Sequence, residues 1–171
     1  MNVYSYLPQH PAALAVFQQT MSDLSADEGL ALRDAYDFAR CHTVVDVGGG
    51  RGGLLAILLQ VFPSLQGILL DLPVVVEGAQ ALFQTEPLRG RCQLMGGDFL
   101  AAVPPGGDLY LLKRVLVGLT DDEARTLFTN IRRAMAPQGR LLVADPDSRS
   151  PFGKLYDMLM LMGFGSRLRT D

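Results

Sequence analysis

The chain has 171 residues, of which 49% are hydrophobic and 19% are charged, and its formal net charge is −3. This composition excludes a disordered chain, which would combine low hydrophobicity with high net charge. The sequence contains no lysine and arginine run of the kind that follows a nucleic-acid backbone, and no apolar run near the ~20 residues of a membrane helix. We therefore expect neither nucleic acid nor a membrane as a partner.

The N-terminal residues are neither basic nor strongly apolar, which predicts that they are not a signal peptide. The two cysteines, Cys41 and Cys92, do not have the spacing of metal ligands. Both features favour a cytoplasmic protein with free thiols, and we expect no bound metal.

Helical patterns come first along the chain. One helix is predicted from Pro11 to Thr20. A second is predicted from Ser25 to Phe38, because Ser25-Ala26-Asp27-Glu28 has the form of a capping box, with Ser25 as the N-cap.

Short apolar segments then alternate with helical segments. The predicted strands are Thr43–Val47, Gly67–Leu70, Arg91–Met95, Asp108–Leu112 and Gly139–Ala144. The predicted helices are Gly53–Phe62, one that Pro73 opens, one that a capping box at Thr120 opens and that ends near Met135, and Pro151–Met162. This alternation predicts an α/β fold of the Rossmann-like kind, with a parallel sheet covered by helices on both faces.

Each predicted strand ends in glycine or a charged residue. These ends are Asp46–Gly52, Asp71, Gly97–Asp98, Lys113 and Asp145. Ligands of such sheets bind outside the carboxyl ends of the strands, so the sequence predicts a binding site there.

The segment Gly48-Gly49-Gly50-Arg51-Gly52-Gly53 follows a strand and precedes a helix. Glycines let the backbone turn sharply and approach a ligand closely, although a glycine cluster by itself is also compatible with a plain tight turn. Asp46, just before it, would repel a pyrophosphate but would accept hydrogen bonds around an amino-acid group. This combination indicates S-adenosylmethionine rather than a dinucleotide.

Three further residues extend this prediction. Asp71 would accept both ribose hydroxyls, unless it is only a surface acid before Leu72-Pro73. Asp98 would accept from the adenine amino group with Phe99 packed on the ring, unless Gly97-Asp98 is only a turn. Lys113 ends an apolar strand, where a lysine is costly without a partner.

The histidines are His10 and His42, and both are interpreted as surface residues, so no Ser-His-Asp, Cys-His or metal site is expected. The methionines of the last helix, Met158, Met160 and Met162, either belong to the core or face a flat aromatic substrate.

Together these motifs resemble the small-molecule O-methyltransferases of the caffeate or plant type, in particular their bacterial antibiotic-tailoring branch. The matching segments span most of the chain: Phe17–Ser25, Val45–Gly52, Leu70–Pro73, Gly96–Phe99, Tyr110–Lys113 and Gly139–Val143.

The resemblance implies S-adenosylmethionine or S-adenosylhomocysteine as cofactor and a small aromatic or polyketide hydroxyl compound as substrate, and it leaves a homodimer open. The residues predicted to bind the cofactor, from the motifs and the resemblance together, are Ser25, Asp46, Gly48, Gly50, Asp71, Leu72, Asp98, Phe99 and Lys113. The predicted substrate residues are Phe17, Met21, Met158 and Met162. Residues 1–40 would form a helical lead-in over the cofactor site, and residues 41–171 the S-adenosylmethionine-binding domain.

The chain departs from the family pattern at the general base. Relatives have a histidine four residues after the lysine, and this chain has Val117 there, while Asp145 matches the acid that orients the histidine and is a weak substitute. Relatives also have a helical dimerisation domain before the region matched here and an antiparallel strand pair after it, so the fifth strand is expected to be an exposed edge.

These departures leave three hypotheses. The first is an O-methyltransferase that acts by proximity on an acidic or otherwise activated hydroxyl. The second is a relative that keeps the cofactor and performs other tailoring chemistry, such as hydroxylation. The third is a non-catalytic binding partner; a nicotinamide-dependent dehydrogenase is a more distant fourth.

Overall fold

The central sheet is built from the short apolar segments that the sequence predicts. The computed structural model describes residues 6–147 and 149–164. Its strands are β1 (Thr43–Val47), β2 (Gln66–Asp71), β3 (Cys92–Gly96), β4 (Leu109–Lys113) and β5 (Arg140–Ala144). They pair in parallel in the order β3-β2-β1-β4-β5, so the predicted Rossmann-like α/β class is confirmed.

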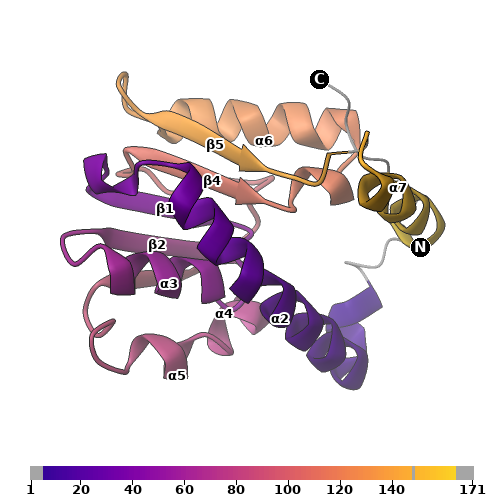
Figure 1. Cartoon of the computed structure of the whole chain (residues 1–171), viewed down its shortest axis with the longest axis horizontal. Helices are drawn as coiled ribbons and strands as arrows, with labels where there is room; N and C mark the ends of the chain where they lie inside the picture. The colour runs from indigo at the N-terminus through magenta and orange to yellow at the C-terminus, as the bar shows by residue number, and fades with distance from the viewer. Residues whose placement is uncertain (1–5, 148, 165–171) are drawn as a thin grey trace.

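Helices lie before, between and after the strands. They are α2 (Pro11–Ala35), α3 (Gly53–Val61), α4 (Pro73–Glu77), α5 (Gln80–Phe83), α6 (Asp121–Ala134) and α7 (Pro151–Phe164), with short 3₁₀ turns η1 (Leu7–Gln9), η2 (Phe38–Arg40) and η3 (Leu116–Gly118). Figure 1 shows α3 and α6 on opposite sides of the sheet. The core therefore has two layers, one in which Leu55 and Leu58 of α3 are buried and one in which Leu127 and Ile131 of α6 are buried.

The N-terminal helices differ from the prediction. The structure has one continuous helix, α2, where two were expected, so the prediction of a helix start with Ser25 as N-cap was wrong. The segment between the two expected helices, Met21–Leu24, contains neither glycine nor proline, and nothing in it stops a helix that has already begun. A capping box can act only where the backbone leaves the helical conformation.

The predicted capping box of α6 is present. The Thr120 hydroxyl accepts from the Glu123 N–H at 3.3 Å, and a Glu123 carboxylate oxygen accepts from the Thr120 N–H at 2.8 Å. Here Leu119 and Thr120 have extended backbone, so the helix has a true start to stabilise.

Strand β5 lies at one edge of the described sheet, as predicted, and its side chains Leu141 and Val143 are 37% and 41% exposed. Among the described residues, no helix has both the length and the apolarity needed to cross a membrane.

Candidate cofactor site

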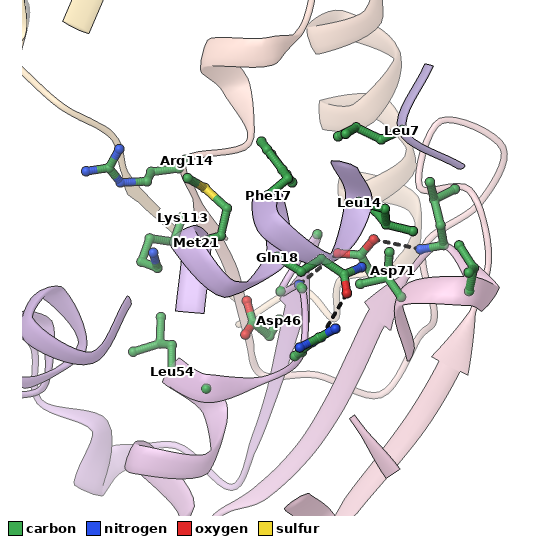
Figure 2. A pocket seen from close by; sticks show the side chains of 18 residues that line it. Leu7, Leu14, Phe17, Gln18, Met21, Asp46, Leu54, Asp71, Lys113 and Arg114 are labelled. Atoms are coloured by element: carbon green, nitrogen blue, oxygen red, sulfur yellow. Dashed lines mark hydrogen bonds between the residues drawn. The ribbon is translucent and has the colours of Figure 1, made fainter. Parts of the chain in front are cut away.

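The register of the sheet brings the charged strand ends together. Asp46 on β1 is opposite Leu69 on β2 and Leu111 on β4, so the strand ends beyond them lie at one edge. A pocket opens at this edge beneath α2 (Figure 2). Its polar lining residues are Gln18, Asp46, Arg51, Asp71, Lys113 and Arg114. Its apolar lining includes Leu7, Leu14, Phe17, Met21, Leu54 and Leu72.

The glycine turn forms the floor of this pocket. Gly48, Gly50 and Gly52 have φ angles of +71°, +62° and +77°, which residues with a side chain rarely adopt. A Cβ on Gly49 would lie 2.4 Å from Asp46 Oδ2, and one on Gly52 would lie 2.5 Å from the Phe83 ring. A Cβ on Gly50 would meet no atom within 4 Å. The turn therefore packs tightly against the protein at Gly49 and Gly52, and it leaves open space at Gly50.

Asp46 lies directly under the turn and is only 1% exposed. Its Oδ2 is buried and makes no hydrogen bond with any described residue. Burial raises the pKa of this carboxyl group, the nearby Lys113 ammonium lowers it and the Asp71 carboxylate raises it, and the net pKa is about 7. A buried carboxylate with an unused oxygen is well suited to a cationic partner.

Asp71 is fixed by two backbone donors. Its Oδ2 accepts the Gly50 N–H at 2.7 Å, and its Oδ1 accepts the Leu72 N–H at 2.7 Å. Burial raises the pKa of this carboxyl group, and the two N–H groups counteract that rise. Each oxygen keeps a second lone pair, so Asp71 can still accept from two ligand hydroxyls.

Lys113 and Arg114 at the end of β4 pair with Glu28 of α2. Lys113 Nζ lies 3.2 Å from Glu28 Oε2, and the Arg114 guanidinium makes a closer pair with the same carboxylate. Burial by itself would raise the pKa of Glu28, but the Arg114 hydrogen bond and the charges of Arg114 and Lys113 outweigh it and lower that pKa. The Arg114 guanidinium also lies 4.9 Å from the ring centroid of Tyr156 on α7.

Of the predicted acceptor residues, Phe17 and Met21 of α2 line the pocket. Met158 and Met162 do not line it, and they are 51% and 77% exposed on α7. The side chain of Ser25 lies outside the part of the chain that the structure describes.

Asp98 and Phe99 follow β3 and are not among the residues that line the pocket. The Asp98 side chain is exposed, and its Oδ1 accepts the Leu100 N–H at 2.8 Å. The Phe99 ring lies against the glycine turn, since a Cβ on Gly48 would be 3.5 Å from its Cε1.

Val117, where the resemblance predicts a histidine in the relatives, is 3% exposed in η3 and packs with Met160 and Tyr156 of α7. Asp145 follows β5 and lines a second hollow together with Glu28 and Lys113. Among the described residues, no cluster of histidine, cysteine and acidic side chains is suited to hold a metal ion.

Several residues of the site are not predicted from the sequence, namely Gln18, Glu28, Arg51, Leu54 and Arg114. Glu28 belongs to the capping-box pattern at Ser25, and that pattern gives no sign of its pairing with Lys113 and Arg114 of the β4 end. A signal for Gln18 was present, because Leu14, Phe17, Gln18 and Met21 have the i, i+3, i+4, i+7 spacing of one helix face.

The parallel sheet, the glycine turn and the acids at the ends of β1 and β2 define a Rossmann-like methyltransferase fold. The chain belongs to the O-methyltransferase domain family, whose model matches residues 1–171.

Similar proteins come from antibiotic biosynthesis. The mitomycin biosynthesis 6-O-methyltransferase of Streptomyces lavendulae is 39% identical over 166 residues, which cover 95% of this chain and 48% of that protein. The aclacinomycin 10-hydroxylase RdmB of Streptomyces purpurascens is 38% identical over 156 residues, 86% of this chain and 42% of that protein. The chain thus spans about half the length of the curated relatives it matches.

Solved structures agree with this assignment. The neocarzinostatin O-methyltransferase NcsB1, in complex with S-adenosylmethionine and 2-hydroxy-5-methyl naphthoic acid, superposes with a TM-score of 0.90 at 32% identity. The match covers 99% of this chain and 52% of that chain.

Proposed function

We propose that this chain is the cofactor-binding part of an S-adenosylmethionine-dependent O-methyltransferase that acts on a small aromatic or polyketide hydroxyl compound. One observation carries the proposal: a pocket beneath α2 in which Asp46 and Asp71 flank a glycine turn that leaves open space at Gly50. We place it in the cytoplasm because Cys41 and Cys92 are free thiols. A homodimer remains a prediction.

The pocket fits the chemistry of the cofactor. The unused Oδ2 of Asp46 suits the positive charge of the amino-acid part, and the fixed carboxylate of Asp71 suits the ribose hydroxyls. The open space at Gly50 admits a ligand against the backbone. Leu72 borders the same pocket, and Asp98 and Phe99 next to it are proposed to contact adenine, with Ser25 at the carboxylate end.

The acceptor is proposed to lie against Phe17 and Met21, the apolar part of the pocket roof. When bound, S-adenosylmethionine supplies a methyl group activated by its sulfonium sulfur. The chain then contributes alignment, which is worth up to ~7–11 kcal/mol of the barrier. Met158 and Met162 are proposed to contact the acceptor when α7 moves toward the pocket or the acceptor extends to α7.

Val117 cannot take the acceptor proton, because its side chain has no basic atom and is buried against Met160 and Tyr156. A general base contributes about 10²–10⁴ in rate, so an acceptor with an ordinary phenol pKa of about 10 would react slowly. We therefore propose an acidic or otherwise activated hydroxyl, already ionised near neutral pH. Asp145 is a weak candidate for a contribution to proton transfer.

A second function is proposed on one observation, the similarity to the hydroxylase RdmB. In that case the chain would keep the cofactor and perform non-methyl-transfer tailoring chemistry. A non-catalytic role is the third alternative.

The test is incubation of the chain with methyl-labelled S-adenosylmethionine and a panel of hydroxyarenes whose acidity is graded. We expect labelled products, and a pH profile of kcat/KM that follows the pKa of each acceptor. Binding of the cofactor with no transfer to any acceptor would contradict methyl transfer. A product with an unchanged number of methyl groups and altered oxidation level would favour the second function, and failure to bind the cofactor would favour the third.

A further inference from the structure

A hydrogen bond joins the roof of the pocket to its floor. The Arg51 Nε of the glycine turn donates to Gln18 Oε1 of α2 at 2.8 Å. Figure 2 shows this bond between Gln18 and the turn below it. The contact links segments that are far apart in the chain and lie on the two sides of the cofactor pocket.

Gln18 is in an unusual place for an amide side chain. It is 8% exposed and lies on a helix face with Leu14, Phe17 and Met21, all of which line the pocket. A buried amide is costly unless it is hydrogen-bonded, and the bond from Arg51 supplies one partner for its oxygen. Its neighbour Gln19 is exposed and bonds instead to Asp23 on the same helix, at 2.8 Å.

The C-terminal half of α2 is held by separate contacts. Glu28 pairs with Lys113 and Arg114, and Gly29 sits so close to α3 that a Cβ would lie 3.0 Å from Ile57 Cδ1. The helix is therefore fixed to the domain at its C-terminal half, while the Gln18 contact holds its N-terminal half.

The pocket beneath α2 is small for its proposed ligand. The cavity beneath α2 has a volume of ≈ 150 Å³. Pockets that hold molecules of cofactor or drug size have volumes of about 300–1,000 Å³. Entry of S-adenosylmethionine therefore requires the side chains of the α2 roof, or its N-terminal half, to move away from the glycine turn.

We propose that Gln18 and Arg51 form a latch that holds the N-terminal half of α2 closed over the cofactor pocket and thereby sets the rate of cofactor exchange. The inference rests on the proposed cofactor, and it assigns to Gln18 a positioning role. Movements of such lids commonly limit how fast ligands bind and leave. Opening the latch leaves the Glu28 attachment in place, so α2 stays on the domain.

The experiment measures association and dissociation of S-adenosylhomocysteine on the immobilised chain by surface plasmon resonance. Gln18→Ala is expected to raise the dissociation rate about tenfold, as the loss of one part-buried, charge-assisted hydrogen bond would do. The association rate should rise as well, so that Kd changes by less than the dissociation rate. Gln19→Ala is the matched control and should leave both rates unchanged.

Gln18→Asn keeps an amide but is one methylene shorter, so it should reproduce the faster exchange if the alanine variant does not fold. In a double-mutant cycle, Arg51→Met should add little to Gln18→Ala, because either change opens the same bond. Full additivity of the two effects would contradict the latch.

The outcomes separate the two proposals. If the unaltered chain does not bind S-adenosylhomocysteine, the proposed cofactor function fails, and the latch with it. If it binds, and Gln18→Ala matches Gln19→Ala in both rates, only the latch is overturned. A weaker Kd with an unchanged association rate would also overturn it, because Gln18 would then be a ligand contact.

Discussion

At the scale of single residues, the site depends on charged groups that are taken out of water. Asp46 lies under the glycine turn at 1% exposure, and Arg114 at the end of β4 has a side chain that is only 7% exposed. Arg114 also has a φ of +57°, a conformation that costs a non-glycine residue free energy and that recurs at functional sites. Its partner Glu28 supplies the charge that makes this burial tolerable.

The raised pKa of Asp46 predicts a particular pH dependence of stability. Because its pKa is about 7 in the folded chain and 3.8 as the ordinary value, folding favours the protonated acid. This contribution is fully present below about pH 4 and is lost as the pH rises through about 7. Asp46→Asn does not titrate, so it should not lose this stability. The unfolding free energy of the variant should therefore rise relative to that of the unaltered chain, by a few kcal/mol from pH 4 to pH 8.

Urea unfolding across this pH range measures the difference, and the exposed Glu77→Gln is the control. A difference between Asp46→Asn and the unaltered chain that is constant with pH would show that Asp46 is ionised throughout.

Val117 gives a second prediction at this scale. Placing the family histidine there by Val117→His would bury an imidazole beside Met160 and Tyr156, where the described contacts are apolar. We expect a loss of about 1–3 kcal/mol in the free energy of unfolding, measured by urea. Val117→Ile keeps the site apolar and should cost less. A histidine variant as stable as the unaltered chain would mean that a polar partner reaches this position.

At the scale of elements, the glycines of the turn have two different roles, close packing against the protein and close approach of a ligand. Gly52 is pressed against Phe83, whereas Gly50 faces open space, although both have positive φ. One position therefore serves packing and the other serves the approach of a ligand.

This difference predicts that stability and binding separate. Gly50→Ala is expected to cost only about 1 kcal/mol of stability, from the left-handed backbone, while it greatly weakens S-adenosylmethionine binding. Gly52→Ala should be far more destabilising, because its Cβ would lie 2.5 Å from the Phe83 ring. Urea unfolding and calorimetric titration measure the two properties, and equal losses of stability would contradict this account of the turn.

At the scale of the whole molecule, α2 is attached to the sheet by charges from a distant part of the chain. Glu28 is 85 residues from Lys113 in the sequence, and the two meet beside the pocket. The helix that forms the roof of the pocket therefore depends on the end of β4.

We expect Glu28→Gln to increase amide hydrogen exchange in the C-terminal half of α2, because the buried Arg114 loses its charged partner. The pKa of Glu28 is lowered in the fold, so the pair stabilises above the ordinary pKa and weakens as the pH falls through the folded value. Asp122→Asn removes the exposed pair with Arg125 and should leave exchange in α2 unchanged. Equal exchange in both variants would contradict the attachment.

The sequence by itself determined the strands, their parallel class and the polar strand ends, because alternation of apolar segments with helices and the glycine turn are local patterns. It also located Asp46, Asp71 and Lys113, since residues at strand ends must meet at one edge of a parallel sheet. The continuous α2 was mispredicted, because a capping-box pattern inside a helix looks the same in sequence as one at its start.

Only the tertiary structure decided which partners these residues have. The pairs Gln18–Arg51 and Glu28–Arg114 join segments that are 33 and 86 residues apart, and no periodicity records such a contact. It also decided that Val117 is packed by α7, because burial at that position depends on a helix more than thirty residues later. Sequence patterns identify the charged groups at the strand ends, and the packing of α2 and α7 determines which other residues join them and how the site is closed.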